Sequence, residues 1–496
     1  MNTPTTNSRV SDSCSPLPEA SALVSGPTGD RAPRETITRW RVNRVFWIKD
    51  SLPHATRTLH TRSTDESCET EHLGFRCWSG DVEVDVRSPL TAKAFQALPF
   101  AEQVGYLRAW EPKTSDLDGP MREGLAAILQ EEVNSQAVPY FERADQFSGL
   151  DPLYSTALVR GFSDGLKGKA VSSWESFWRF ARWVLAQCDP ETEVRDAFSG
   201  ETQLGRRWQF CRLEIARFLD ATLNGKLAPL PRGERAAVWQ LIDVLAHDAN
   251  PAATDESHED EGIMDPLALS LNTVRGVAVH SMFSYVCWIR SHSSENAPTG
   301  QNLDDVREAR EVLQACLDLQ LESSPEIRSV FCANLARLAS LEEEWLRDHV
   351  EQIFRPHGQN EQPYSTWEMF IRFCHADSRI FALLRQQYSS AILRMPQNET
   401  EGSSQPDSRV SLGKHLVVSY CRGALDFEQP GDLLAAFITR APEPVRADVM
   451  GFVGRSLAQS NGPLPTKMFA RLLKLWNWLV QRETPAGGPG FQDRAA

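Results

Sequence analysis

The polar residues with the best spacing for chemistry lie within one apolar stretch. The stretch DPLALSLNTVRGVAVHSMFSYVCWIRSH, Asp265 to His292, is predicted to form one long helix. Asn272, Gly276 and His280 are spaced four residues apart, so on a helix they lie one above another, with Arg275 beside them. An amide, a guanidinium and an imidazole on one helix face could bind a ligand or a phosphate group.

The favoured interpretation of this group is a polar clamp that ties the helix to a neighbouring loop. If Arg275 is buried, it must meet a carboxylate or several carbonyls, because an unpaired buried charge costs several kcal/mol. Gly276 costs about 1 kcal/mol relative to alanine in a helix interior, which predicts a close approach of a crossing helix. An enzyme or ligand site around Asn272, Arg275 and His280 is the alternative.

Two aspartates are predicted as helix N-caps. Asp151 and Asp265 are each followed by proline and then by an apolar helical pattern. Aspartate is a favoured N-cap residue and proline suits the first helical position. The stretches that they begin, DPLYSTALVRG and DPLALSLNTVRG, match at DPL and VRG but differ by one inserted residue.

No motif for nucleotide, metal or hydrolytic chemistry is complete in the sequence. In GFSDGLKGKA, residues 161–170, Ser163 replaces the first glycine of a phosphate loop and Ala170 replaces its hydroxyl residue. Neither G-x-S-x-G nor H-E-x-x-H occurs. The acidic loop around His258 lacks the ligand spacing of a calcium or zinc site. We therefore expect no catalytic residue, no cofactor and no metal, and the chain is not expected to be an enzyme.

Composition limits the remaining classes. The formal net charge of −14 disfavours sequence-independent nucleic-acid binding, which needs a basic surface. A nucleic-acid-sensing module is the alternative function, and its candidate inner-face arginines are Arg206, Arg207, Arg212 and Arg217. No window approaches the roughly 18 apolar residues of a membrane helix, so no membrane association is expected. The ten cysteines form no C-x-x-C pair, which is typical of a cytoplasmic protein.

The tryptophans at positions 174, 178 and 183 form another candidate site. With Arg179 and Arg182 between them, they could be an aromatic platform for nucleic acid. Trp174 and Trp178 share a helix face, however, and phenylalanines flank them. Core packing between neighbouring helices is therefore the favoured interpretation.

The pattern after Pro89 predicts an all-α fold. Apolar residues recur three and four apart, and turn-forming clusters interrupt them roughly every 15 to 25 residues. The helices predicted from this pattern include Thr91–Ala109, Arg122–Ser135, Glu326–Phe354 and Thr366–Arg394. At this length an irregular α-solenoid of antiparallel helix pairs, similar to HEAT or TPR arrays, is favoured over a single bundle.

Changes in composition divide the chain into eight segments. The short alternations WRVNRVFWIKD and DVEVDV predict short strands before the helical region. The segments are a disordered tail (1–39), a poorly defined segment with short strands (40–88), an N-terminal helical array (89–249), an acidic linker (250–262), a central helical array (263–395), a polar linker (396–408), C-terminal helices (409–482) and a second disordered tail (483–496).

Several long stretches carry a resemblance to a known class of protein. They are MDPLALSLNTVRGVAVHSMFSYVCWIRSH, GPMREGLAAILQEEVNSQAVPYFERADQFSGLDPLY, LPRGERAAVWQLIDVLAHD, SSPEIRSVFCANLARLASLEEEWLRDHVEQIF, HLVVSYCRGALDF and APEPVRADVMGFVGRSL. Together they resemble the C-terminal helical, HEAT-like region of large bacterial ATP-binding proteins with a STAND-like or other P-loop NTPase core. The resemblance extends from about Ser88 to Val480.

The resemblance implies a sensor or scaffold arm of a nucleotide-switched protein, and some relatives of that class are linked with anti-phage defence. This sequence has no Walker A motif, and its first 90 residues are too few for an NTPase domain, so it resembles the arm without the NTPase. A split-gene product, a remnant and an independent adaptor all fit. The expected partner is another protein, for example an NTPase encoded nearby, and the oligomeric state is left open.

Overall fold

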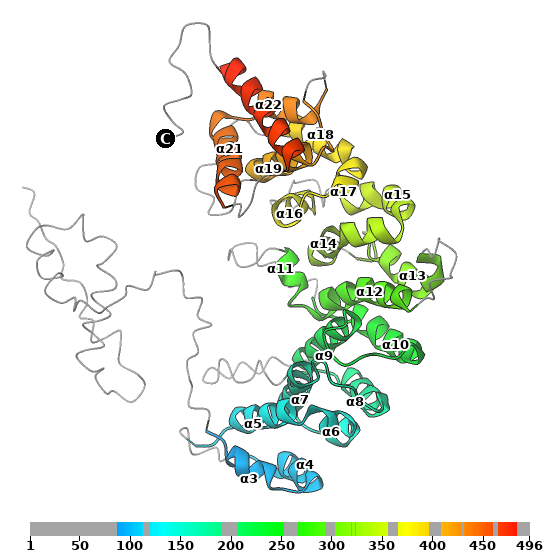
Figure 1. Cartoon of the computed structure of the whole chain (residues 1–496). Coiled ribbons are helices and arrows are strands. Elements are labelled where there is room, and N and C mark those ends of the chain that lie inside the picture. Colours follow the sequence, from blue (N-terminus) through cyan, green and yellow to red (C-terminus); the bar gives the residue numbers. More distant parts are fainter. Residues whose placement is uncertain are drawn as a thin grey trace, which may run out of the picture. The chain divides into compact units, whose positions relative to one another are not determined.

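The computed structural model describes residues 87–112, 119–189, 207–251, 266–292, 303–318, 320–322, 324–355, 366–395, 408–427, 431–459 and 465–483. All of them belong to one compact unit, Val86–Ala496. Every regular element in these ranges is a helix, and none of these residues is in a strand. The predicted all-α class is therefore confirmed (Figure 1).

The described helices fall into two halves along the chain. Those of the first half are α3 (Ala92–Gln96), α4 (Phe100–Ala109), α5 (Arg122–Ser135), α6 (Ala137–Phe141), η3 (Ala144–Phe147), α7 (Pro152–Gly165), α8 (Glu175–Leu185), α9 (Trp208–Leu223), η5 (Arg232–Glu234), α10 (Arg235–Ala246), α11 (Pro266–Ser270) and α12 (Val274–Ser291). Those of the second half are η7 (Leu303–Val306), α13 (Arg307–Ala315), α14 (Pro325–Leu341), α15 (Glu343–Ile353), α16 (Thr366–Phe373), α17 (Ser378–Leu383), α18 (Arg385–Arg394), α19 (Ser408–Cys421), α20 (Leu433–Arg440), α21 (Glu443–Ala458) and α22 (Thr466–Glu483).

Two sets of helices pack in chain order. In the first set α5 packs on α7, α7 on α9, α9 on α12, α12 on α14, α14 on α16 and α16 on α19. Helices between them in the chain form the second set: α8 and α10 pack on α9, α10 and α13 on α12, and α15 on α14. Helices α9, α12 and α14 thus each have neighbours before them, after them and in the second set, which explains why α12 and α14 are buried on most sides.

Aromatic side chains fill the core between α6, α8 and α9. The Phe141 and Phe177 rings are stacked with centroids 5.0 Å apart, and the Phe177 and Phe218 centroids are 4.7 Å apart. Trp174 and Trp178 stack at 5.2 Å and are only 2% and 1% exposed. These two tryptophans are core residues, as favoured from the sequence, because rings without exposed faces cannot stack on bases.

Some predicted helices are too long. Thr91–Ala109, Glu326–Phe354 and Thr366–Arg394 are each interrupted. Pro99 has extended backbone angles and precedes α4. Glu342 is extended, with φ −158° and ψ 90°, between α14 and α15. Asp377 caps α17 by accepting hydrogen bonds from the amides of Arg379 and Ile380. In each case local capping or an extended residue overrides the continuous apolar period.

Several sequence predictions fall outside the part of the chain that the structure describes. They include Asp265 as an N-cap, His258 and most of the acidic linker, Arg206, the polar linker apart from Ser408, and almost all of the segments before Pro89 and after Glu483. Within the described ranges no helix combines the length and apolar character needed to cross a membrane.

Candidate functional site

The predicted helix Asp265–His292 is wrong: α11 and α12 are separate helices. The break at residues 271–273 arises because Asn250 accepts hydrogen bonds at the start of α12 through both its side chain and its main chain. The Val274 amide donates to Asn250 Oδ1 at 2.9 Å, and the Arg275 amide donates to the Asn250 carbonyl at 3.0 Å. These bonds satisfy two of the first-turn amides that a helix end leaves without partners. The α12 helix therefore starts at Val274 and does not continue α11.

Gly276 marks a close approach, but not of a crossing helix from elsewhere in the chain. A β-carbon at this position would lie 2.2 Å from the Ser270 carbonyl oxygen and 2.6 Å from Thr273 Oγ1. The neighbour is thus the end of α11, which folds back against the first turn of α12. Glycine lets the two backbones meet at this sharp break.

Arg275 pairs with a carboxylate and a carbonyl. Its Nε lies 3.1 Å from Glu322 Oε2, and its Nη1 donates to the Asp248 carbonyl at 3.2 Å. The two charged side chains are 20% and 12% exposed. Arg275 thereby links α12 to the turn after α10 and to the connection before α14, which is the geometry of a clamp.

Asn272 lies in the break and not on the helix face predicted for it. Its Nδ2 donates to the Ala268 carbonyl at 2.9 Å, and its Oδ1 accepts from Arg217 Nη2 at 2.9 Å. Arg217 also pairs with Glu214 at 3.1 Å. Asn272 therefore joins the α11–α12 turn to α9.

His280 lies at the junction of α11, α12 and α14. Its Nε2 is 3.1 Å from Ser270 Oγ, and its Nδ1 is 3.3 Å from Asn334 Nδ2. Burial lowers the pKa of His280 to about 4, although the charge of Asp220 opposes the shift and that of Arg337 adds to it. The imidazole is therefore neutral at pH 7 and serves as a hydrogen-bonding hub.

The three polar residues of the predicted site thus have separate partners. Asn272 reaches α9, Arg275 reaches the 248–250 turn and Glu322, and His280 reaches Ser270 and α14. Their functional groups do not converge on a common point where a substrate could sit. These residues therefore form several separate contacts between helices around the start of α12.

Asp151 lies directly before α7. Its Oδ1 accepts from the Leu153 amide at 3.0 Å, and its Oδ2 accepts from Arg122 Nη1 at 2.8 Å. The carboxylate thus caps α7 and also ties it to the start of α5. The sequence pattern contains the cap, but not the ion pair.

Stability is expected to fall as the pH is lowered from 7 to 5.5, partly through His280. Its folded-state pKa lies below the unfolded value near 6.5, so the unfolded chain binds the proton more tightly. The contribution of His280 to the free energy of unfolding is complete above pH 6.5 and is lost as the pH falls toward 4. At pH 5.5 the loss is about 1 kcal/mol. Urea denaturation should show that loss for the parent and a flatter profile for His280→Gln. If the stability of the parent and of His280→Gln fell equally with pH, the role of His280 in this pH dependence would be contradicted.

Two of the arginines considered for nucleic-acid sensing are engaged by carboxylates. Arg212 lies 2.8 Å from Asp189 and 2.7 Å from Asp248, and only 13% of its side chain is exposed. Arg217 pairs with Glu214. Neutralised guanidinium groups contribute little to phosphate binding, so these residues do not form a basic surface.

Two glycines of the phosphate-loop-like segment serve helix packing. Gly161 and Gly165 lie on α7, where it crosses α5. A β-carbon on Gly165 would lie 2.5 Å from the Asn134 carbonyl oxygen, and one on Gly161 would lie 2.7 Å from Val133. The spacing G-x-x-x-G thus lets two helix backbones approach closely and does not cradle phosphate.

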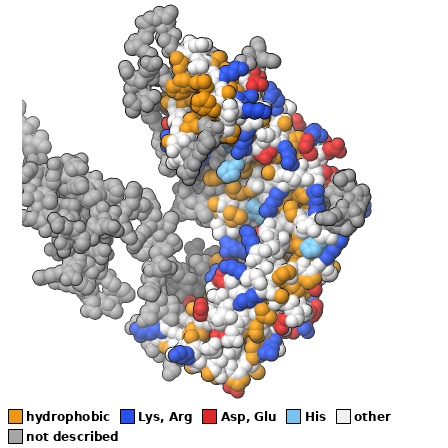
Figure 2. Space-filling model, viewed as in Figure 1, with side chains coloured by type: hydrophobic (Ala, Val, Ile, Leu, Met, Phe, Trp, Pro, Cys, Tyr) orange, Lys and Arg blue, Asp and Glu red, His pale blue; other side chains and the backbone are white. Residues whose placement is uncertain are grey.

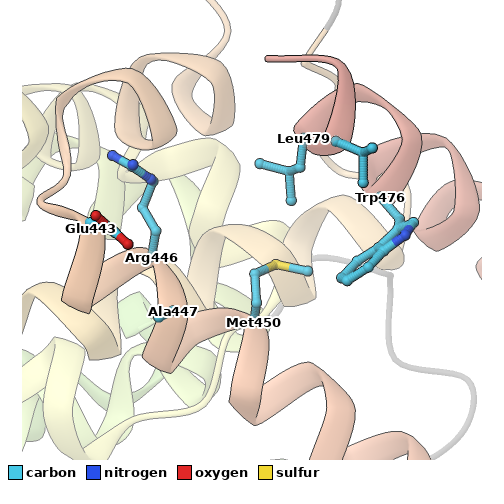
Figure 3. Close-up of a pocket in the computed structure, with 7 residues that line it drawn as sticks. Glu443, Arg446, Ala447, Met450, Trp476 and Leu479 are labelled. Atoms are coloured by element: carbon cyan, nitrogen blue, oxygen red, sulfur yellow. The ribbon is translucent and has the colours of Figure 1, made fainter. Parts of the chain in front are cut away.

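A groove between α21 and α22 is the candidate site that sequence reasoning missed. Figure 3 shows the Met450 side chain of α21 directed toward Trp476 of α22. Arg446 on α21 and Leu479 on α22 also line the groove. Glu443, Ala447 and Val480 complete its lining. The groove is mainly apolar, with charged groups at one end.

An exposed apolar stripe borders this groove. Phe469, Leu473 and Trp476 are 56%, 49% and 41% exposed and follow the i, i+4, i+7 spacing of one face of α22. Leu457 near the end of α21 is 40% exposed. Figure 2 shows hydrophobic side chains gathered over these C-terminal helices.

The opposite face of α22 holds the helix on α19. Arg471 Nε donates to the Tyr420 carbonyl at 2.6 Å, and its guanidinium lies 4.4 Å from the Tyr420 ring centroid. Leu475 is fully buried, and Trp478 packs on Phe427 with centroids 5.1 Å apart. The helix is thus firmly placed through one face while the Phe469 stripe is left accessible.

Within the described ranges no three histidine, cysteine, aspartate or glutamate side chains gather as a metal site would require. The seven described cysteines are free thiols. Searches against family models, curated proteins and solved structures gave no match.

Proposed function

We propose that this chain is a non-catalytic helical-repeat scaffold that binds another protein through the α21–α22 groove. The observation that carries the proposal is the exposed stripe of Phe469, Leu473 and Trp476 beside an apolar groove. Contiguous exposed apolar surface of this kind typically marks an interaction site.

The scaffold is an irregular α-solenoid of antiparallel helix pairs, similar to HEAT arrays. Packing of α5, α7, α9, α12, α14, α16 and α19 in chain order supports this arrangement, as does a second set of helices beside them. In such arrays each unit contacts its neighbours, and the last unit normally has a polar outer face. Helix α22 departs from that rule, which supports a partner at this end of the described helices.

The partner that fits is an amphipathic helix with acidic flanks. Helix α22 carries four basic side chains and one acidic one, in a chain with a net charge of −14. Its apolar stripe has the i, i+4, i+7 spacing with which helices pack into grooves. Acidic residues beside the apolar face of the partner would complement the charge of α22.

The sequence resemblance extends the proposal to a biological setting. In it, the chain is the sensor or scaffold arm of a bacterial STAND-like NTPase of the defence type. The partner is then an NTPase encoded nearby that lacks its own helical arm. Its contact segment would be expected to contain the acidic amphipathic helix.

Binding of a synthetic acidic amphipathic helix tests the groove. A labelled peptide with leucines at i, i+4 and i+7 and glutamate flanks should bind the parent in fluorescence anisotropy. Leu473→Glu should weaken binding at least tenfold, about 1.4 kcal/mol, because it places a carboxylate in the apolar stripe and repels the acidic flanks.

The matched control is Leu393→Glu, which changes an exposed leucine of α18 that is 62% exposed. It should bind the peptide like the parent. Equal losses in both variants, or equal binding of a scrambled peptide, would contradict the proposal. Binding of anionic vesicles in preference to the peptide would assign the stripe to a lipid surface instead.

A further inference from the structure

Arg328 is a buried cation whose hydrogen-bonding capacity is unused. It lies in the first turns of α14 and is 1% exposed. Its Nε, Nη1 and Nη2 atoms are all buried and have no hydrogen-bond partner. A guanidinium keeps its charge inside a protein, so such a group normally faces a carboxylate or another oxyanion.

The nearby carboxylates are committed to other donors. Glu322 accepts from Arg275 Nη2 through Oε1 at 3.4 Å, and its Oε2 lies 3.1 Å from Arg275 Nε. It also accepts from the Ser324 amide at 2.9 Å. Glu326 accepts from the Ser324 hydroxyl. Neither carboxylate is bonded to Arg328, which leaves its five N–H donors without an acceptor.

A second arginine adds to the positive charge. Burial lowers the pKa of Arg328, the charge of Arg355 lowers it further, and Glu322 opposes both. Arg355 follows α15 and is exposed. The charge of an exposed side chain therefore acts on the buried guanidinium.

We propose that Arg328 and Arg355 bind a phosphate-type oxyanion near the start of α14. A phosphate offers three acceptor oxygens and up to two negative charges, which suits two guanidinium groups better than a single carboxylate does. The N-terminal end of the seventeen-residue α14 adds a favourable helix dipole. The site is independent of the α21–α22 groove, so it makes the scaffold responsive to a small anion.

The test compares melting temperatures in inorganic phosphate and in chloride at equal ionic strength. Millimolar phosphate should raise the melting temperature of the parent in a saturable manner. Arg328→Met should abolish that rise and should melt about 2 °C or more above the parent in chloride, because it removes an unpaired buried charge. The Arg355→Gln variant should weaken the response.

Arg337→Met is the matched control, since Arg337 lies on the same helix but donates to Ser284 and Asn224. It should keep the phosphate response. Phosphate also stabilises proteins without binding, but that effect would be equal in all variants. An equal response in Arg328→Met, no response in the parent, or an Arg328→Met protein that melts below the parent in chloride would overturn the proposal. An equal rise in acetate would overturn the phosphate assignment in favour of a carboxylate.

Discussion

Gly276→Ala is expected to lower the free energy of unfolding by about 2 to 4 kcal/mol, although alanine is the better helix former. The added β-carbon would lie 2.2 Å from the carbonyl oxygen and 2.7 Å from the α-carbon of Ser270. Both are backbone atoms, so no side-chain rotation can relieve the clash. Helix α11 would have to move, and it packs on α14. Urea denaturation of the parent and the variant measures the loss.

Gly105→Ala provides the opposite case. Gly105 lies in α4, and a β-carbon there would have no neighbour within 4 Å. Alanine should then stabilise the protein by up to about 1 kcal/mol, because it restricts the unfolded chain and favours the helix. If Gly276→Ala were as stable as the parent or more so, as expected for Gly105→Ala, the break between α11 and α12 would not be as tight as described.

The break before Gly276 also shows where sequence reasoning ends. Apolar periodicity predicts Arg122–Ser135 with both ends correct, because both signals are local. The start of α12 depends on Asn250, which is 24 residues away in the chain. A cap supplied across that distance leaves no mark in the apolar pattern of residues 265–292. Pro99 is different, since a proline after a short apolar run is a visible break signal.

The groove was missed for a related reason. Helix α22 has apolar residues on two faces, and from the sequence both could be buried. Packing of Leu475 and Trp478 against the preceding helices uses one face, and no described helix covers Phe469 or Leu473 to a similar extent. Which face lacks a neighbour is decided by where the described helices end, and periodicity does not contain that information.

For Arg275, local chemistry predicts the kind of partner but not its identity. The sequence predicts that Arg275 needs a carboxylate or carbonyls, and the structure supplies Glu322 and Asp248. The partner identities could not be predicted, because many acidic residues were available. Buried Arg328, by contrast, follows Glu326 in a pattern that reads as an ordinary charged helix face.

Arg275→Ala should cost roughly 3 kcal/mol of unfolding free energy, because it strands Glu322 and the Asp248 carbonyl. The Arg275 side chain is 20% exposed and that of Glu322 is 12% exposed, so water can compensate only part of the loss. His280→Ala should cost less, about 1 to 2 kcal/mol, because a neutral hydrogen-bonding group is removed. Arg347→Ala, at the exposed pair with Glu343 on α15, should change stability by less than about 0.5 kcal/mol.

Chemical denaturation in the parent and in the Arg328→Met background measures the Arg275 effect. In the Arg328→Met background Arg328 cannot pair with Glu322 in place of Arg275. The loss of unfolding free energy should therefore be at least as large. Adding Glu322→Gln to Arg275→Ala should restore part of the stability, because the stranded charge is then removed. Suppose instead that Arg275→Ala left the free energy of unfolding unchanged or raised it in both backgrounds. The native Arg275 would then lower stability, as residues kept for function often do. The clamp interpretation would then give way to a binding role for Arg275.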